Sequence, residues 1–323
     1  MDIPQLGDRI LAGDRRALAR AITLIESRRS DHREQATALL DHLGTRRQAL
    51  RIGLSGTPGV GKSTFIESFG LMLTAQGLRV AVLAVDPSST RSGGSILGDK
   101  TRMDLLARDP GAFIRPSPSQ THLGGVARRT REVVTLCEAA GFDVVLIETV
   151  GVGQSETVVA EISDLFVLLL APAGGDELQG VKRGIMEMAD LILVNKADGD
   201  LKAAANRTRA DYAGALHLLR KRSQDPEGFP KAMTVSAIEN AGLGAAWDEM
   251  RALVDWRRDA GHWDQRRADQ ARYWFTQEVR QTLLARLETA HARRLLDGLA
   301  AQVSSGTLTP GAAARQAIAG LPH

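Results

Sequence analysis

The sequence predicts an α/β fold with a doubly wound, mostly parallel sheet, extended by helical segments at both ends of the chain. Between Arg51 and about Arg258, short apolar runs rich in Val, Ile and Leu alternate with longer amphipathic segments. The runs are apolar at nearly every position, which is typical of parallel strands covered by helices on both faces. A glycine-rich turn joins the first run to the first helix, as in doubly wound sheets that bind ligands at the carboxyl ends of their strands.

The expected strands follow one another along this middle region. They cover Ile52–Ser55, Val80–Val85, Ala112–Arg115, Val144–Glu148, Leu165–Leu170, Leu191–Asn195 and Met233–Ser236. Helices are expected between and after them, because the apolar residues there recur at helical spacing. These helices cover Lys62–Ala75, Val126–Ala139, Val181–Met188, Ala203–Leu219 and Gly244–Arg257.

Both ends of the chain are expected to be helical. Apolar residues recur at helical spacing near the start, and a further helix is expected over Glu34–Leu43; the early set is Leu6, Ile10, Leu11, Leu18, Ile22 and Ile25. In the tail, Phe275, Val279 and Leu283 step by four, and arginines such as Arg266 are expected on a solvated helix face. The chain thus divides into a helical segment 1–48, an α/β domain 49–258 and a helical segment 259–323 suited to self-association.

Composition excludes several classes of protein. The 323 residues carry a net charge of +3 with basic and acidic residues interleaved, whereas a nucleic-acid-binding face needs clustered charge. The longest apolar run, Leu165–Ala171, is far shorter than the ~20 residues of a membrane helix. No signal peptide is recognisable, and the single cysteine, Cys137, allows no internal disulfide. We therefore expect a cytoplasmic protein with neither a nucleic-acid nor a membrane partner.

The strongest motif is a phosphate loop that fits the pattern G-x-x-x-x-G-K-[ST] between a strand and a helix. Its glycines let backbone N–H groups approach a phosphate, and the helix N-terminus adds partial positive charge. Lys62 is expected to reach the β- and γ-phosphates, and the Ser63 hydroxyl to ligate Mg²⁺. The expected nucleotide-binding residues of this loop are Gly56, Thr57, Pro58, Gly59, Val60, Gly61, Lys62, Ser63 and Thr64.

A second motif, Asn195-Lys196-Ala197-Asp198, indicates which base is bound, because it matches the N-K-x-D pattern at the end of an apolar strand. The Asp198 carboxylate can accept the N1–H and N2 hydrogens of guanine. Adenine has no such pair of donors, so a buried acceptor left unpaired would disfavour ATP. The aliphatic part of Lys196 is expected to cover the ring, and Asn195 to tie this loop to the phosphate loop.

A short loop after the next expected strand completes the predicted base site. Ser236 and Ala237 resemble the loop whose backbone contacts the guanine carbonyl, and Ile238 is counted with them.

Acidic residues at two strand ends are candidate Mg²⁺ ligands. Asp86 follows one apolar run, and Glu148 ends another, where most GTPases carry D-x-x-G. Glu148 and Gln154 are candidates for placing the attacking water, and the Gly151 N–H for sensing the γ-phosphate. Asp99 stands in a polar, glycine-rich stretch, residues 90–102, that we expect to close over Mg²⁺ and the γ-phosphate.

A further glycine-rich stretch, residues 173–180, also follows a buried strand and is expected on the ligand side. Together these motifs resemble the MeaB/ArgK/MMAA GTPases of the SIMIBI class of P-loop proteins. The resemblance rests on the phosphate loop, D-P-S-S, G-D-K-T, E-T-V-G-V-G-Q-S-E, G-D-E-L-Q-G and N-K-A-D, and it covers essentially the whole chain.

The resemblance implies a GTP-binding and GTP-hydrolysing chaperone for an adenosylcobalamin-dependent mutase, usually methylmalonyl-CoA mutase. Members control delivery of the cofactor and help to remove damaged cofactor. Ser63, Asp86, Asp99 and Glu148 would surround Mg²⁺. The stretches 90–102, 152–155 and 173–180 would be the family's three switches, and Lys182 would belong to the one at 173–180. The family is homodimeric through its C-terminal helices.

Two alternatives stay open. A small-molecule kinase linked to amino-acid transport, the ArgK-type reading, would need an acceptor pocket beside the γ-phosphate. A nickel- or cobalt-insertion GTPase would carry clustered Cys or His residues, which this sequence lacks. For the leading interpretation we expect slow intrinsic hydrolysis of GTP that the mutase accelerates.

Overall fold

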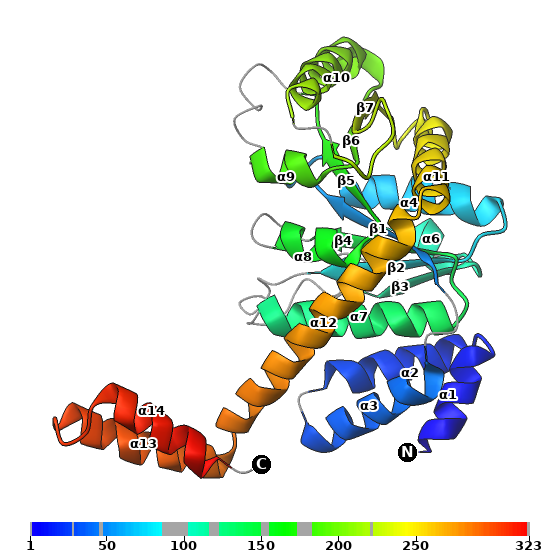
Figure 1. Ribbon diagram of the computed structural model, residues 1–323. Coiled ribbons are helices and arrows are strands. Elements are labelled where there is room, and N and C mark those ends of the chain that lie inside the picture. The colour runs from blue at the N-terminus through cyan, green and yellow to red at the C-terminus, as the bar shows by residue number, and fades with distance from the viewer. Residues whose placement is uncertain are drawn as a thin grey trace. The chain divides into compact units, whose positions relative to one another are not determined.

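The computed structural model describes residues 2–27, 29–44, 48–85, 103–115, 123–149, 155–172, 183–219 and 222–321. Within these ranges seven strands form one sheet in the order β3-β2-β4-β1-β5-β6-β7 (Figure 1), and every neighbouring pair is parallel. The doubly wound parallel sheet predicted from the sequence is therefore confirmed. The strands are β1 (Leu50–Ser55), β2 (Val80–Val85), β3 (Ala112–Arg115), β4 (Val144–Thr149), β5 (Leu165–Leu170), β6 (Leu191–Val194) and β7 (Lys231–Thr234).

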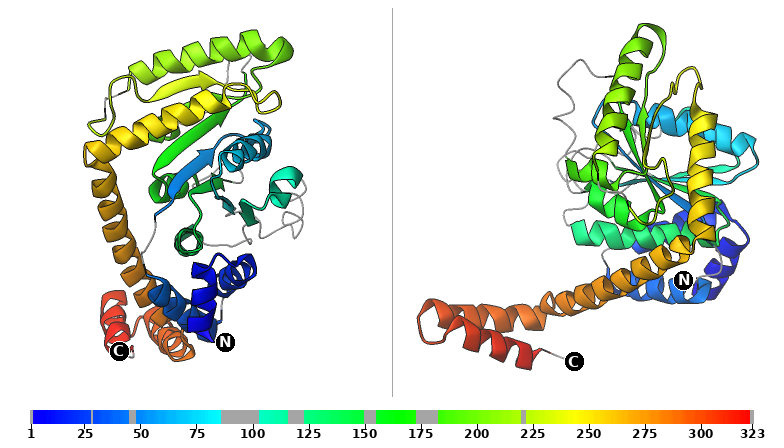
Figure 2. Two further views of the ribbon diagram at one scale, coloured as in Figure 1. Left: turned by 90° about the vertical axis from the view of Figure 1, so that its right-hand side faces the viewer. Right: turned by 45° about the horizontal axis from the view of Figure 1, so that its top comes forward.

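Helices cover both faces of the sheet (Figures 1 and 2), as right-handed crossovers between parallel strands require. One face carries α4 (Lys62–Ala75), α6 (Asp104–Arg108) and α11 (Leu243–Asp259); the other carries α7 (Leu123–Ala139), α8 (Ser155–Ile162), α9 (Arg183–Met188) and α10 (Lys202–His217), the last preceded by the 3₁₀ turn Gly199–Leu201. All residues of β2, β4 and β5 are buried, which explains why their sequences lack alternation.

The main core lies between the sheet and α4 with α11. The rings of Phe65 and Phe69 on α4 stack with centroids 5.2 Å apart, and Trp247 of α11 meets Phe69 edge-on. These rings pack against Ile52 and Leu54 of β1, the strand that leads into the phosphate loop. The phosphate loop therefore follows a central strand that is packed firmly into the core.

Three helices precede the sheet and pack on α7: α1 (Ile3–Leu11), α2 (Arg15–Glu26) and α3 (Ser30–Leu43). The early apolar pattern, predicted as one helix before Glu34, forms two. The chain turns at Gly13, whose φ is +80°. The Asp14 carboxylate then starts α2 by accepting hydrogen bonds from the backbone N–H of Arg16 at 2.8 Å and of Ala17 at 3.1 Å.

Four strands differ in their bounds from the prediction. β1 begins at Leu50 rather than Ile52, and β4 ends at Thr149 rather than Glu148. The strand predicted at Met233–Ser236 is β7 at Lys231–Thr234, because its pairing with β6 runs from Lys231 opposite Leu191 to Thr234 opposite Val194. Beyond this pairing, Ser236 forms a separate bridge with Ala241. β6 ends one residue before Asn195.

The chain separates into two compact units, residues 1–266 and 267–323. The second unit contains the rest of α12 (His262–Leu287), then α13 (Ala290–Ser304) and α14 (Pro310–Gly320), which pack around Leu299, Ala313 and Ala317. An exposed apolar stripe runs along α12; its members are Tyr273, Phe275, Val279, Leu283 and Leu284. Among the described residues, no helix is both long enough and apolar enough to span a membrane.

Candidate nucleotide-binding site

The predicted site residues that the structure describes gather at one edge of the sheet. The phosphate loop follows β1, Glu148 lies near the end of β4, Asn195 follows β6, and Ser236 stands two residues after β7. Because all these strands are parallel, their carboxyl ends share one edge, the usual place for a ligand in an open α/β sheet.

The phosphate loop has the tight backbone that its glycines allow. Gly61 adopts a φ of +87°, and a Cβ placed there would lie 2.8 Å from the Asn195 Nδ2 atom. A Cβ on Gly56 would lie 2.4 Å from the carbonyl oxygen of Leu169 in β5. Both positions therefore exclude any side chain, and the loop curls closely between β1 and β5.

Lys62, the first residue of α4, folds back over this loop. Its ammonium donates to the Gly56 carbonyl at 2.7 Å and lies 3.5 Å from the Thr57 carbonyl oxygen. Burial lowers the pKa of Lys62 below its ordinary value, and the negative charges of Glu148 and Glu156 offset part of this effect. The Lys62 amine is thus held over the loop by two of its backbone carbonyls.

Two strand ends meet beside Lys62. The Thr149 hydroxyl of β4 donates to the Ser55 hydroxyl of β1 at 3.2 Å, which joins the two strands where they reach the site. Glu148, next to Thr149, is only 5% exposed. Its register partners on the neighbouring strands are Leu54 and Ala84. A buried carboxylate near the lysine of a phosphate loop is suited to a cation-binding role.

Asn195 connects three loops. Its side-chain amide donates to the Val60 carbonyl in the phosphate loop at 2.9 Å, and its amide oxygen accepts from the Ala237 N–H at 3.1 Å. The side chain is buried. A single residue therefore ties the end of β6 to the phosphate loop and to the loop after β7.

The remaining base-site residues are arranged around Asn195. The Ser236 hydroxyl donates to the Asp198 carboxylate at 2.5 Å, which orients that carboxylate. Lys196 adopts a positive φ of 58°, and its ammonium donates to the Gly59 carbonyl at 2.6 Å, so its side chain extends across to the phosphate loop. Ile238 is 74% exposed at this edge.

Several predicted residues lie outside the described part of the chain: Asp86, Asp99, Gly151, Gln154 and Lys182. Their predicted roles stay predictions. Thr57, Pro58, Gly59 and Thr64 are exposed, and Ser63 is half-buried. Within the described ranges, no three His, Cys, Asp or Glu side chains gather as a metal site would require, and two of the four predicted Mg²⁺ ligands lie beyond those ranges.

Two further residues contribute to the site without a role assigned from the sequence. The Ser68 hydroxyl on α4 donates to the Ala237 carbonyl at 2.7 Å and so holds the loop after β7. Glu156 on α8 is 3% exposed and acts electrostatically on Lys62. Glu156 is the last residue of the E-T-V-G-V-G-Q-S-E segment, and its place in that motif could have indicated a role at the site. Ser68 carries no such signal, because in a single sequence it resembles any polar residue of a helix.

A parallel sheet with a phosphate loop after a central strand and an N-K-x-D loop two strands away defines a P-loop GTPase. A family model described as "Methylmalonyl Co-A mutase-associated GTPase MeaB" matches residues 18–292. The chain belongs to this MeaB family, and the resemblance stated from the motifs is confirmed.

Individual relatives agree with this assignment. The mouse protein named methylmalonic aciduria type A homolog, mitochondrial, is 49% identical over 317 residues, which are 94% of this chain and 76% of that protein. The Escherichia coli protein named GTPase ArgK is 49% identical over 286 residues, 86% of this chain and 84% of that protein. A crystal structure of an LAO/AO transport system kinase aligns with a TM-score of 0.74 and 38% identity over 98% of this chain and 96% of that one.

Proposed function

We propose that this chain is a GTP-dependent chaperone of an adenosylcobalamin-dependent acyl-CoA mutase, with methylmalonyl-CoA mutase as the first candidate. Binding and hydrolysis of GTP would gate adenosylcobalamin loading and protect or reactivate the mutase. Family membership supports the partner. The observation that carries the guanine-nucleotide part is Asn195, which joins the phosphate loop to the two loops that would hold the base.

The loop after β1 fits a nucleotide phosphate. Gly56 and Gly61 leave a cradle that a Cβ would fill, and the Lys62 ammonium lies over it. Backbone N–H groups at the start of α4 complete an anion site of the kind that binds phosphates in P-loop proteins. Asp198 and Ser236 would select guanine, with Ala237, Ile238 and the Lys196 side chain around the ring.

The same site fits Mg²⁺. Ser63 offers a hydroxyl beside Lys62, and Glu148 a buried carboxylate, both oxygen ligands that this cation prefers. Asp86 and Asp99 would complete the set. When bound, Mg²⁺ would neutralise charge that develops on the β- and γ-phosphates.

Hydrolysis is proposed to be slow until the partner binds. Glu148, Gln154 or Lys182 would place the attacking water or stabilise charge only in the complex, as happens in P-loop GTPases that need a partner to complete the site.

A homodimer is proposed through the second unit. Phe275, Val279 and Leu283 step by four along α12 and are exposed in the single chain, Phe275 to 69%. An exposed apolar stripe of this kind marks an association surface. A second copy of the same stripe is its proposed partner, as expected for a two-fold symmetric interface.

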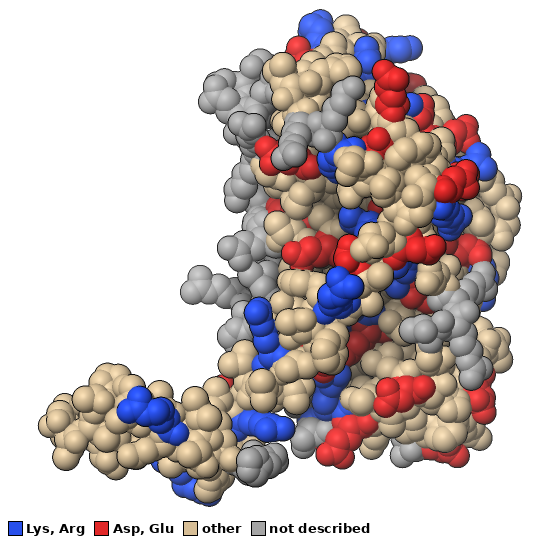
Figure 3. Space-filling view, viewed as in Figure 1, with Lys and Arg blue, Asp and Glu red and all other residues tan. Residues whose placement is uncertain are grey.

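Nucleic acid and membrane are not proposed as partners, and the location is proposed to be cytoplasmic. Over most of the face drawn in Figure 3, Lys and Arg side chains are interspersed with Asp and Glu side chains. Nucleic-acid binding needs a basic patch or stripe instead.

The direct test is co-purification with the mutase of the same organism, without nucleotide, with GDP, and with a non-hydrolysable GTP analogue. A gating chaperone must bind the mutase with different affinities in these states, because a ligand shifts an equilibrium only by its differential affinity. Equal affinity in all states would contradict the proposal. So would labelled phosphate transferred from GTP to arginine or ornithine, which would favour the kinase alternative.

A further inference from the structure

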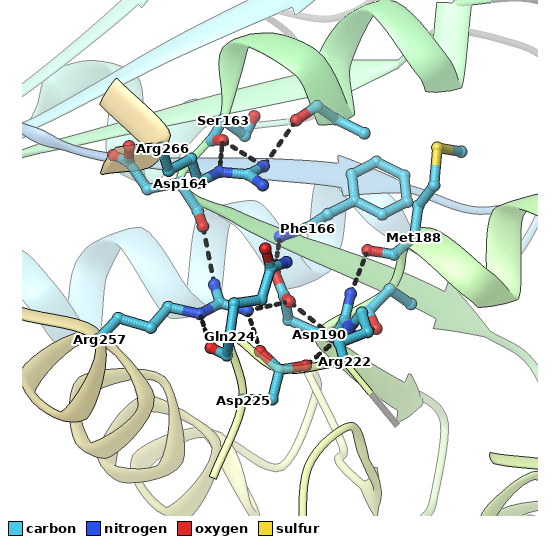
Figure 4. Close-up of polar contacts among 12 residues, drawn as sticks. Ser163, Asp164, Phe166, Met188, Asp190, Arg222, Gln224, Asp225, Arg257 and Arg266 are labelled. Atoms are coloured by element: carbon cyan, nitrogen blue, oxygen red, sulfur yellow. Dashed lines mark hydrogen bonds and ion pairs between the residues drawn. The ribbon is translucent and has the colours of Figure 1, made fainter. Parts of the chain in front are cut away.

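The amino-terminal edge of the sheet, opposite the nucleotide site, holds a cluster of buried ion pairs (Figure 4). Asp190 precedes β6, and the Arg257 guanidinium of α11 lies 2.6 Å from it and 2.6 Å from Asp225. Arg222 pairs with the same two carboxylates, at 3.0 and 2.6 Å. This cluster fixes the end of α11 against the amino-terminal edge of the sheet.

Arg266, in the first turns of α12, reaches the C-terminal end of α8 (Figure 4). Its guanidinium donates to the Ser163 carbonyl at 2.8 and 3.2 Å and to the Ala160 carbonyl at 3.1 Å. Carbonyls at a helix end lack partners within the helix and favour a cation. The prediction that Arg266 lies on a solvated face is therefore wrong. Arg257 adds a bond to the Asp164 carbonyl at 3.1 Å, so α11 and α12 hold the same turn.

α8 packs against β1 and β4 and begins beyond the carboxyl end of β4, at the edge of the sheet where the described candidate site residues gather. Glu156, in its first turn, is buried and acts electrostatically on Lys62 of the phosphate loop. With eight residues, α8 is about 12 Å long. A short helix therefore begins at the sheet edge that carries Lys62 and ends under the Arg266 guanidinium.

The C-terminal part of α8 packs closely against β1. A Cβ on Gly53 of β1 would lie 2.6 Å from the Ser163 Oγ atom and 2.8 Å from a Val159 methyl carbon. Ser163 also donates to the Val159 carbonyl at 2.6 Å. Packing this close would transfer a displacement of α8 at Glu156 to the carbonyls of residues 160–163.

We propose that α8 transmits the occupancy of the phosphate site to α12 through the Arg266 guanidinium. The proposal rests on the proposed function, because guanine nucleotide is the input. Phosphate groups at Lys62 would add negative charge facing Glu156, which changes the electrostatic force on α8 between nucleotide states. α12 continues as one helix to Leu287, so a displacement of its first turns would act on this same helix.

Hydrogen exchange read by mass spectrometry tests this on the full chain. The observed segment is residues 265–270, whose first amide bonds the Gly261 carbonyl at 3.2 Å. We expect its exchange rates in wild type to differ at least about threefold between GDP and a non-hydrolysable GTP analogue. Arg266→Met should abolish this difference and speed exchange about tenfold, since charge-assisted bonds to helix-end carbonyls are lost. Arg266→Lys should retain part of it, because an ammonium can donate to the same carbonyls.

Matched variants decide between transmission and simple capping. Arg272→Met, further along α12, removes only an exposed contact to Asp269 and should keep the wild-type nucleotide difference. Glu156→Gln should remove the exchange difference between nucleotides while leaving the hydrogen bonds of Arg266 in place. If Arg266→Met does not fold, Glu156→Gln tests the transmission in its place. Calorimetry of GTP binding runs alongside. If wild type binds GTP but its exchange rates do not differ between nucleotides, or if the difference survives Arg266→Met, the transmission is overturned and the proposed function stands. If wild type does not bind GTP, the proposed function is overturned as well.

Discussion

Arg257→Met should destabilise the first unit strongly. The Arg257 side chain is 3% exposed and bonds the Asp190 and Asp225 carboxylates at 2.6 Å each, together with the carbonyls of Asp164 and Gln224. Its removal leaves two buried carboxylates with Arg222 as their remaining cation in this cluster. Removing one partner of a buried ion pair costs about 3–5 kcal/mol, because the other charge stays buried without compensation. For a unit of this size, that lowers Tm by about 6–20 °C.

The effect should depend on pH in a definite direction. Burial disfavours the Asp190 carboxylate, but Arg257 and Arg222 outweigh this and hold its pKa below the ordinary value. Such a group stabilises the fold above its unfolded pKa of ~3.9, and this stability is lost as pH falls through the folded value. Without Arg257, burial dominates and the carboxyl pKa rises. The destabilisation by Arg257→Met should therefore be largest near neutral pH and shrink on acidification.

Urea unfolding followed by tryptophan fluorescence measures this, since Trp247 and Trp263 are buried in the same unit. Arg108→Met is the control: its exposed guanidinium lies 4.0 Å from Asp104, and such a pair is worth at most ~0.5 kcal/mol. A loss below about 1 kcal/mol at pH 7 for Arg257→Met, or a loss that grows in acid, would refute the reasoning from buried charge.

Three further predictions concern the nucleotide site. Lys62→Ala should lower GTP turnover on the order of 10²–10³-fold, as for removal of a preorganised cation or donor at a reacting phosphate, with single-turnover rates as the measurement. Asp198→Asn should weaken GTP binding and shift preference toward xanthosine triphosphate, because the amide donates where that base offers an oxygen; competition binding reads this out, and an unchanged preference would contradict the base assignment. Gly61→Ala should cost about 1–2 kcal/mol from its left-handed φ alone and displace Asn195, whereas Gly244→Ala, with open space around it, should be neutral or stabilising in thermal melts.

The sequence predicted well where local chemistry decides the structure. The phosphate loop has the predicted position because glycine is the residue type that fits the backbone at positions 56 and 61. α4 has the predicted bounds, Lys62–Ala75, since the loop starts it and a buried apolar face sustains it. The placement of Asn195 at a strand end also followed from the buried run before it. Whether these residues bind nucleotide stays a prediction.

Features set by distant residues could not be predicted. β7 is an edge strand whose limits come from its pairing with β6. Its apolar pattern predicts a strand that begins and ends two residues later than the observed one. The buried cluster joins Asp190, Arg222 and Arg257, which are far apart in sequence and look like ordinary surface charges. The contacts of Arg266 could not be predicted either. Its partners are backbone carbonyls, which leave no signal in the sequence.

The proposed base site is central: Asn195 joins the phosphate loop to the loop after β7, and Asp198 beside them would recognise guanine. Isothermal titration calorimetry of the purified chain with Mg²⁺, using GDP and ADP in parallel, measures this directly. We expect saturable binding of GDP and an affinity for ADP at least about 10²-fold weaker, because a site built to bond the guanine donors leaves its acceptors unpaired with adenine. No GDP binding, or equal affinity for both nucleotides, would contradict the central claim.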